Sequence, residues 1–194
     1  MVSIEQIKQL RDETELSISE VKKALEETGG DMLKAKELLK ALGKKLVAKK
    51  ADRETNSGLV VSYVHPNSKM GVLLDIRCES DFVANGPDFK NLAHELCLQI
   101  AAMKPLFVSE KDIPEEFLDG ETKIYKEQVA DSGKPENIIN QIIEGKLKKY
   151  KESVCLLSQV WVKDDTKTIK NLIEDTVGKI GENIEIKKFA RFEI

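Results

Sequence analysis

The chain has 194 residues, of which 31 are Lys or Arg and 34 are Asp or Glu, so its formal net charge is −3. This near balance argues against a general nucleic-acid-binding protein, which would be basic over most of a domain. Hydrophobic residues make up 41% of the chain, enough for a core, and charged residues make up 34%, which is typical of solvated helix surfaces. The composition predicts a soluble, globular, helix-rich protein and indicates no particular activity.

The cysteines and the first residues bear on the compartment. Cys78, Cys97 and Cys155 form no closely spaced pair, and this odd, sparse set favours buried thiols in a reducing cytosol over a disulfide scaffold. Residues 1–5 show neither the basic nor the apolar segment of a secretory signal, and no stretch approaches a membrane span in length and apolarity. We therefore expect a cytoplasmic protein with no membrane partner.

Residues 1–43 show the pattern of three short helices that share one small core. Apolar residues recur within each segment at the spacing of a buried helix face. The residues suited to begin or end these helices are Ser3 with Gln6, Ser17 with Glu20, Gly29, Asp31 and Gly43. Ser3 and Ser17 can begin capping boxes, Gly29 can adopt the left-handed conformation, and Gly43 is expected to end the third helix.

Residues 44–56 differ in composition from the segments on either side. From Lys40 to Arg53 the chain carries six positive residues and one negative residue, a local charge of 6 − 1 = +5. No Pro interrupts this stretch, which predicts a partly helical, basic linker. Its lysines either form a solvated helix face or contact an acidic partner surface.

Residues 57–194 are expected to form a mixed α+β core with antiparallel strands. Apolar and β-branched residues over 58–65 and an alternating pattern over 70–77 flank a turn signal at 66–69. These two runs predict a hairpin. A weakly alternating run at 184–194 predicts a last strand.

The rest of this core is predicted to be largely helical. Apolar spacing indicates a helix from about residue 88, two helices within 115–150 with a break at 131–135, and a helix over 169–180. The apolar run Val154–Val162 indicates a buried strand. A buried stripe is expected on the second helix of the pair, at Ile138, Ile139, Ile142 and Ile143.

Motifs of known reaction centres are absent from the sequence. Gly133-Lys134 resembles the end of a phosphate-binding loop, but Gln128 stands where the first Gly is needed and Pro135 where Ser or Thr is needed. His94-Glu95 begins like a zinc-protease helix, but Leu98 replaces the second His. There is no Gly-x-Ser-x-Gly elbow. We expect no enzyme activity, no catalytic residue, no metal and no cofactor.

The segment from Cys78 to Pro87 places a large aromatic side chain, Phe82, on a short connection after a strand. Phe82 either packs inward as a core residue or is presented to a partner. In the second case its burial at an interface contributes roughly 1.5–3 kcal/mol, and central aromatic residues are typical interface anchors.

Ordered sequence tags along nearly the whole chain resemble those of bacterial elongation factor Ts. The tags are Leu10-Arg11-x-x-Thr14, Lys22-Lys23-Ala24-Leu25, Gly30-Asp31, Asp81-Phe82-Val83-Ala84, Ser132-Gly133-Lys134-Pro135-Glu136, Ile143-Glu144-Gly145-Lys146-Leu147 and Phe189-x-Arg191-Phe192. The resemblance implies a translation elongation factor that binds GDP-loaded elongation factor Tu. It implies that GDP is released and exchanged for GTP, because magnesium is displaced and the nucleotide site is distorted.

The resemblance also implies which residues contact the partner. Ser80, Asp81, Phe82 and Val83 match the segment that dislocates magnesium, with Phe82 as the wedge and Asp81 as the polar contact. In the head, the positions that match contacts to the GTP-binding domain are Arg11, Ile18 and Lys22. For Ile18, core packing is an equally open alternative.

This chain departs from the family pattern in three places. Ser80 stands where the family usually has Thr, Arg77 where it usually has Asn, and Glu15-Leu16-Ser17 where it has a Gly-rich loop. Ser80 keeps the hydroxyl group. The last change bears on the contacts of the head.

The length of the chain bears on its assembly. Many members of the family carry a second, related half of the core, and 194 residues leave room for one copy only. We therefore expect a homodimer, with a self-complementary contact at the strand-rich core or the C-terminal strand.

Two other functions are compatible with parts of the sequence. Three-helix heads of this size resemble ubiquitin-associated domains, so the alternative is a protein-interaction module with a ubiquitin-associated-like head and no exchange activity. Direct RNA binding through residues 40–53 is disfavoured, because the total charge is balanced and no aromatic residues are interleaved.

Overall fold

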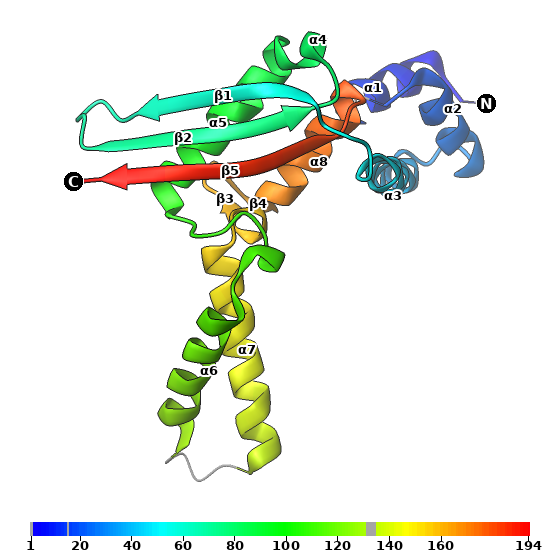
Figure 1. Cartoon of the computed structure of the whole chain (residues 1–194). Helices are drawn as coiled ribbons and strands as arrows, with labels where there is room; N and C mark the ends of the chain where they lie inside the picture. Colours follow the sequence, from blue (N-terminus) through cyan, green and yellow to red (C-terminus); the bar gives the residue numbers. More distant parts are fainter. Residues whose placement is uncertain (1, 15, 131–134) are drawn as a thin grey trace. The chain divides into compact units, whose positions relative to one another are not determined.

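The computed structural model describes residues 2–14, 16–130 and 135–194, which form helices and a small antiparallel sheet (Figure 1). The α+β prediction is confirmed. The chain forms two compact units, each built from three stretches. Unit 1 comprises Met1–Val60, Asp75–Ala93 and Asn171–Glu185. Unit 2 comprises Val61–Leu74, His94–Lys170 and Ile186–Ile194.

Unit 1 begins with three helices, α1 (Ile4–Thr14), α2 (Ile18–Glu27) and α3 (Met32–Lys50). The predicted caps are confirmed. The Ser3 hydroxyl accepts from the backbone N–H of Gln6 at 3.1 Å, while the Gln6 side chain accepts from the Ser3 N–H at 3.0 Å. Ser17 and Glu20 form the same reciprocal pair. These bonds satisfy backbone N–H groups that have no partner within a helix.

The turn before α3 follows the sequence prediction, and the end of α3 does not. Gly29 has φ +64°, and the Asp31 carboxylate accepts from the N–H groups of Leu33 and Lys34, both at 3.1 Å. The expected end of the helix at Gly43 is wrong, because α3 continues to Lys50. A glycine within a helix costs only about 1 kcal/mol relative to Ala, which the good helix formers around it offset.

The three helices enclose a small apolar core of their own. Its buried members are Leu10, Leu16, Val21, Ala24, Leu25, Ala35 and Leu39. This cluster supports the predicted head as a packed element. The exact division into a head at 1–43, a linker at 44–56 and a core at 57–194 stays a prediction.

The sheet has three strands in the order β1 (Ser57–Val64), β2 (Met70–Cys78) and β5 (Ile184–Glu193). β1 and β2 form the predicted hairpin, and the His65 N–H donates to the Met70 carbonyl at 2.9 Å where the turn closes. The side chains of β2 alternate in burial along the strand. Leu74 and Ile76 are fully buried and Leu73 is about half exposed, so one face of this strand is covered and the other is open.

Three helices lie next to these strands in the chain, two of them after β2 and one before β5. They are α4 (Asp81–Ala84), α5 (Pro87–Met103) and α8 (Ile169–Ile180), and α8 has the predicted bounds. A short 3-10 turn, η1 (Glu110–Asp112), precedes α6. The helix α5 contributes residues to both units, and its Phe89, Leu96 and Ile100 are fully buried.

Unit 2 contains a helical hairpin of α6 (Glu115–Ala130) and α7 (Glu136–Val154). The predicted break lies outside the described residues except for Pro135, which precedes α7. The predicted stripe on α7 is wrong in its extent. Ile143 is buried, but Ile138 is exposed and the other two are partly exposed. The apolar spacing gives the direction of a helix face, and it does not give how much of that face a neighbour covers.

The expected strand over residues 154–162 is largely wrong. α7 runs to Val154, Cys155 forms an isolated bridge with Phe107, and a 3-10 turn follows as η2 (Leu156–Ser158). The only strand among the described residues of this run is β3 (Val160–Trp161). β3 pairs antiparallel with β4 (Asp164–Thr168). Only Cys155 and Leu156 among the apolar residues of this run are buried, and Leu156 lies in the 3-10 turn.

All three cysteines are buried and unpaired, as predicted. Burial raises the pKa of Cys97 and of Cys155 to about 11. Burial also raises the pKa of Cys78. The thiols therefore stay protonated at neutral pH.

Two buried glutamines join α5 to the segment around β3. The Gln99 amide donates to the Gln159 side-chain oxygen at 3.1 Å and to the Val160 carbonyl at 3.0 Å, and it accepts from the Val162 N–H at 2.9 Å. Gln159 in turn donates to the Ser153 carbonyl at 2.7 Å. Buried amides with satisfied partners fix a single arrangement of irregular backbone.

We predict that Gln99→Leu lowers the free energy of unfolding by about 2–3 kcal/mol, because it leaves the Gln159 oxygen buried without its partner and removes the acceptor of the Val162 N–H. Urea unfolding followed by circular dichroism measures this loss. Gln141→Leu, at an exposed position of α7, is the control and should change stability by less than about 0.5 kcal/mol. Equal stability of the two variants would contradict a role for the amide network.

Candidate functional site

The candidate site is a single helical turn, α4, at the end of β2. Ser80 precedes it with extended backbone, and its hydroxyl accepts from the Val83 N–H at 3.3 Å. At the other end the Asn85 amide donates to the Asp81 carbonyl at 2.9 Å. The sequence therefore folds locally into a capped turn, where it had predicted only a short connection.

Phe82 is presented outward by this turn. Its side chain is 89% exposed, whereas Ala84 on the same turn is buried. Asp81 is also exposed, and Val83 is partly buried. Of the two alternatives for Phe82, packing inside its own core is therefore excluded.

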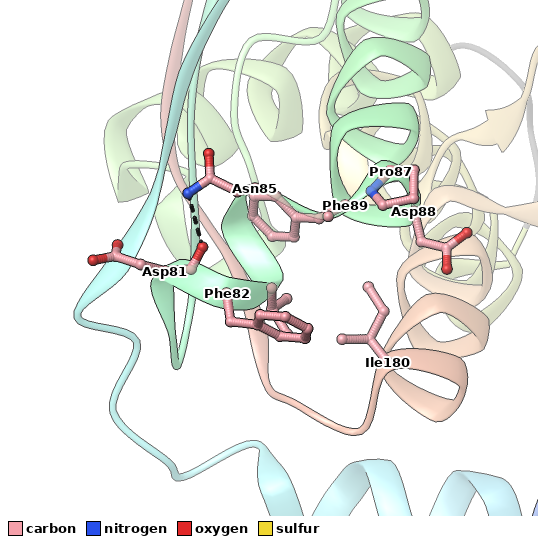
Figure 2. Close-up of a pocket in the computed structure, with 9 residues that line it drawn as sticks. Asp81, Phe82, Asn85, Pro87, Asp88, Phe89 and Ile180 are labelled. Carbon is pink, nitrogen blue, oxygen red and sulfur yellow. Dashed lines mark hydrogen bonds between the residues drawn. The ribbon is translucent and has the colours of Figure 1, made fainter.

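An open groove of about 700 Å³ lies beside the ring (Figure 2). It is lined by α4 residues, by the start of α5 and by Ile180 at the end of α8. Phe89 forms a fully buried part of the lining. An ion pair between Lys179 and Asp88, at 3.0 Å, joins the two helices that border the groove. The groove and the exposed ring form one apolar surface with carboxylates at its margin.

Residues that the sequence did not single out hold the base of α4. The Glu182 carboxylate accepts from the Ser80 N–H at 3.0 Å and from the Ser80 hydroxyl at 2.6 Å. Glu182 follows α8, and Gly181 between them has φ +89°, a conformation that favours glycine. In the sequence, the one sign of this loop is Gly181 directly after the apolar pattern of α8. Nothing in the sequence paired Glu182 with Ser80.

The proposed head residues lie on the surface of unit 1. Ile18 is 54% exposed and lies outside the head core, and Arg11 and Lys22 are exposed. Lys22 lies 3.8 Å from Glu26 on the same helix, a solvated pair of little energetic weight. None of the three lines the groove beside Phe82. The structure therefore brings Ser80, Asp81, Phe82 and Val83 together and leaves the head residues as a separate surface.

Among residues 2–14, 16–130 and 135–194, no group of three or more His, Cys, Asp or Glu side chains is arranged to hold a metal ion. Within the same described part of the chain, no helix is long and apolar enough to cross a membrane.

Comparison with known proteins matches nearly the whole chain to one family. Residues 3–194 match the family model described as Elongation factor TS. A Thermotoga petrophila protein named Elongation factor Ts is 50% identical over 193 residues, which covers 100% of this chain and 96% of that protein. The Rubrobacter xylanophilus protein of the same name is 48% identical over 191 residues, 98% of each chain.

A Coprothermobacter proteolyticus protein, also named Elongation factor Ts, is 48% identical over 193 residues, 100% of this chain and 98% of that protein. The fold and these matches define a translation elongation factor. The chain belongs to the elongation factor Ts family, which confirms the resemblance seen in the sequence.

Proposed function

We propose that this chain binds elongation factor Tu in its GDP form and promotes release of GDP and its exchange for GTP. The support is membership of the elongation factor Ts family together with the exposure of Phe82. An apolar ring that is 89% exposed stabilises its own fold little and is available to a partner. That exposure is the observation on which the proposal rests.

Phe82 acts as a wedge between elements that flank the nucleotide site of elongation factor Tu. Moving this ring from water into a partner pocket contributes roughly 1.5–3 kcal/mol. Asp81 makes a polar contact beside it, while Ser80 and Val83 shape the turn. The shift that accommodates the ring distorts the phosphate-binding loop and displaces the partner's magnesium ion.

Exchange follows from linkage between the two ligands of elongation factor Tu. A factor that prefers the nucleotide-free state weakens nucleotide binding, and nucleotide weakens binding of the factor by the same ratio. The factor therefore accelerates exchange without changing the equilibrium between GDP and GTP. Its own residues make and break no covalent bond, so it acts as a binding protein rather than an enzyme and needs no cofactor.

The head supplies a second contact through Arg11, Ile18 and Lys22. Ile18 and Lys22 are four residues apart on α2 and so share one face of the helix. An exposed apolar side chain one turn from a cation suits a surface with a matching pocket and an acidic residue. Arg11, on α1, adds a second exposed cation to the head. This contact adds affinity, whereas the Phe82 wedge adds the distortion.

A homodimer is the assembly that we propose. The strand order leaves β1 and β5 at the two edges of the sheet, where backbone groups can pair with a second copy. Val60 and Val64 on β1 are 65% and 64% exposed, which adds apolar surface at one edge. Each dimer would serve two molecules of elongation factor Tu in the cytoplasm, without direct contact to nucleic acid or membrane.

We predict that Phe82→Ala lowers the maximal rate of GDP release from elongation factor Tu by about 10- to 100-fold, the factor that corresponds to the burial energy of the ring. Release of fluorescent GDP after mixing with excess factor measures the rate. The melting temperature should stay unchanged, because the ring is exposed and contributes little to the packing of the core.

Leu106→Ala is the matched control, since Leu106 is 58% exposed and does not line the groove. It should release GDP at the unsubstituted rate. A normal rate for Phe82→Ala would contradict the wedge.

For the head, we predict that Ile18→Ala raises the factor concentration needed for half-maximal GDP release by about three- to tenfold, with little change in the maximal rate. A titration of the factor separates the two quantities. Lys23→Ala changes a neighbouring exposed side chain of α2 and should leave both unchanged. A fall in the maximal rate alone would argue against a purely affinity-based role.

For the assembly, we predict that light scattering gives a mass near twice the chain mass of 21.8 kDa. Increased charge at the sheet edge in Val64→Lys should shift the mass toward that of one chain, because desolvating a buried charge is unfavourable. A monomer at every concentration tested would overturn the homodimer.

A further inference from the structure

Two loops of unit 1 exchange hydrogen bonds through a pair of carboxylates, here called the carboxylate clamp (Glu79, Ser80, Glu182 and Asn183). Glu182 accepts from the backbone N–H of Ser80 at 3.0 Å. In return Glu79 accepts from the backbone N–H of Asn183 at 2.6 Å. Each loop thus supplies a charged acceptor to the backbone of the other, and such charge-assisted bonds are stronger than neutral ones.

The Glu182 arm of the clamp acts on α4 through one residue. Both Glu182 oxygens bond Ser80, one through its N–H and one through its hydroxyl at 2.6 Å. Because the hydroxyl proton points to Glu182, the Ser80 oxygen keeps its lone pairs for the Val83 N–H, 3.3 Å away. Glu182 therefore orients the residue that caps the turn carrying Phe82.

The Glu79 arm ties the clamp to the segment before β1. The Asn183 side-chain amide donates to the carbonyls of Ala51 and Arg53 at 3.2 and 2.9 Å. The Arg53 guanidinium lies 3.4 Å from Glu79. Three stretches of chain thus meet at the base of α4.

We propose that Glu182 is a positioning residue for the Phe82 wedge, so that the carboxylate clamp sets the orientation in which the ring meets elongation factor Tu. This inference rests on the function proposed above. A single helical turn has too few internal hydrogen bonds to hold its own conformation in water. The apolar ring also lacks packing that would hold it. The orientation of the ring depends on Ser80, and that of Ser80 on Glu182.

The competing explanation is that Glu182 only stabilises the fold. The two explanations differ in their dependence on Phe82. If Glu182 acts by orienting the ring, its removal has no effect once the ring is gone. If Glu182 stabilises the fold generally, its effect on GDP release persists without the ring. A double-mutant cycle separates these cases.

The first experiment measures fluorescent-GDP release from elongation factor Tu at saturating factor. We expect Glu182→Ala to lower the maximal rate about tenfold, because the ring then spends less time in the orientation that fits the partner; this factor corresponds to about 1.4 kcal/mol. Glu182→Gln keeps one oxygen acceptor for the Ser80 N–H and should recover most of the rate. Glu144→Ala removes an exposed carboxylate from α7 and is the control for charge.

The cycle adds Phe82→Ala and the double variant Phe82→Ala/Glu182→Ala. The double variant should release GDP at the rate of Phe82→Ala alone. A further tenfold fall in the double variant, or a normal rate for Glu182→Ala, would overturn the positioning role. Melting temperatures measured in parallel show whether each variant remains folded at the assay temperature.

A second experiment uses the free protein and needs no partner. In Glu182→Ala, the amide proton of Ser80 should shift upfield, and the backbone order parameter at Phe82 should fall from about 0.85 toward about 0.6. An unchanged amide shift and order parameter would overturn the inference. If the unsubstituted chain fails to accelerate GDP release while these changes occur, the proposed function fails and the positioning of α4 by Glu182 stands.

Discussion

An aromatic ring held in water must be supported by something other than its own burial. This constraint applies to Phe82, because α4 is only one turn long and the Phe82 ring lies outside the core. The support is polar and lies beneath the turn, in the bonds between Ser80 and Glu182. A ring buried in its own core would hold the turn but would not be available to a partner. Here the hydrogen bonds of Ser80 hold the turn, and the ring stays available.

The same solution occurs in unit 2, where irregular backbone is fixed by polar side chains. Gln99 and Gln159 are buried and bond the backbone on either side of β3. In both places a side chain from a regular element or its end satisfies the N–H or C=O groups of a neighbouring loop. Apolar packing determines where the helices and strands lie, and these polar contacts determine the loops between them.

The sequence predicted the features that depend on local chemistry. Capping boxes at Ser3 and Ser17, the turn at 66–69 and the helix α8 depend on residues close together in the chain, and each is confirmed. The errors arose where local patterns are ambiguous. Gly43 suggests a helix end, but helices tolerate isolated glycines and α3 continues to Lys50. The apolar run 154–162 suggests a strand, but its buried apolar residues are Cys155 at a bridge and Leu156 in a 3-10 turn, where short apolar runs also occur.

The candidate site divides in the same way. The sequence allows Phe82 to point into its own core or outward to a partner, and only the three-dimensional structure decides between these positions. Glu182 lies 102 positions from Ser80, and in the sequence it looks like any of the solvated acidic residues of the chain. No pattern in a single sequence distinguishes such a residue, because its importance comes from a partner that the fold brings to it.

The burial of the three thiols affects how readily the protein is oxidised at cysteine. Cys78 precedes the clamp by one residue and donates to the Ser80 carbonyl at 3.2 Å, so any adduct on its sulfur would force apart the base of the docking turn. Oxidation by peroxide and exchange with disulfides both begin with attack by an accessible thiolate, a form that burial suppresses at all three positions. Burial of Cys78 therefore protects the turn that carries Phe82 from modification at this sulfur.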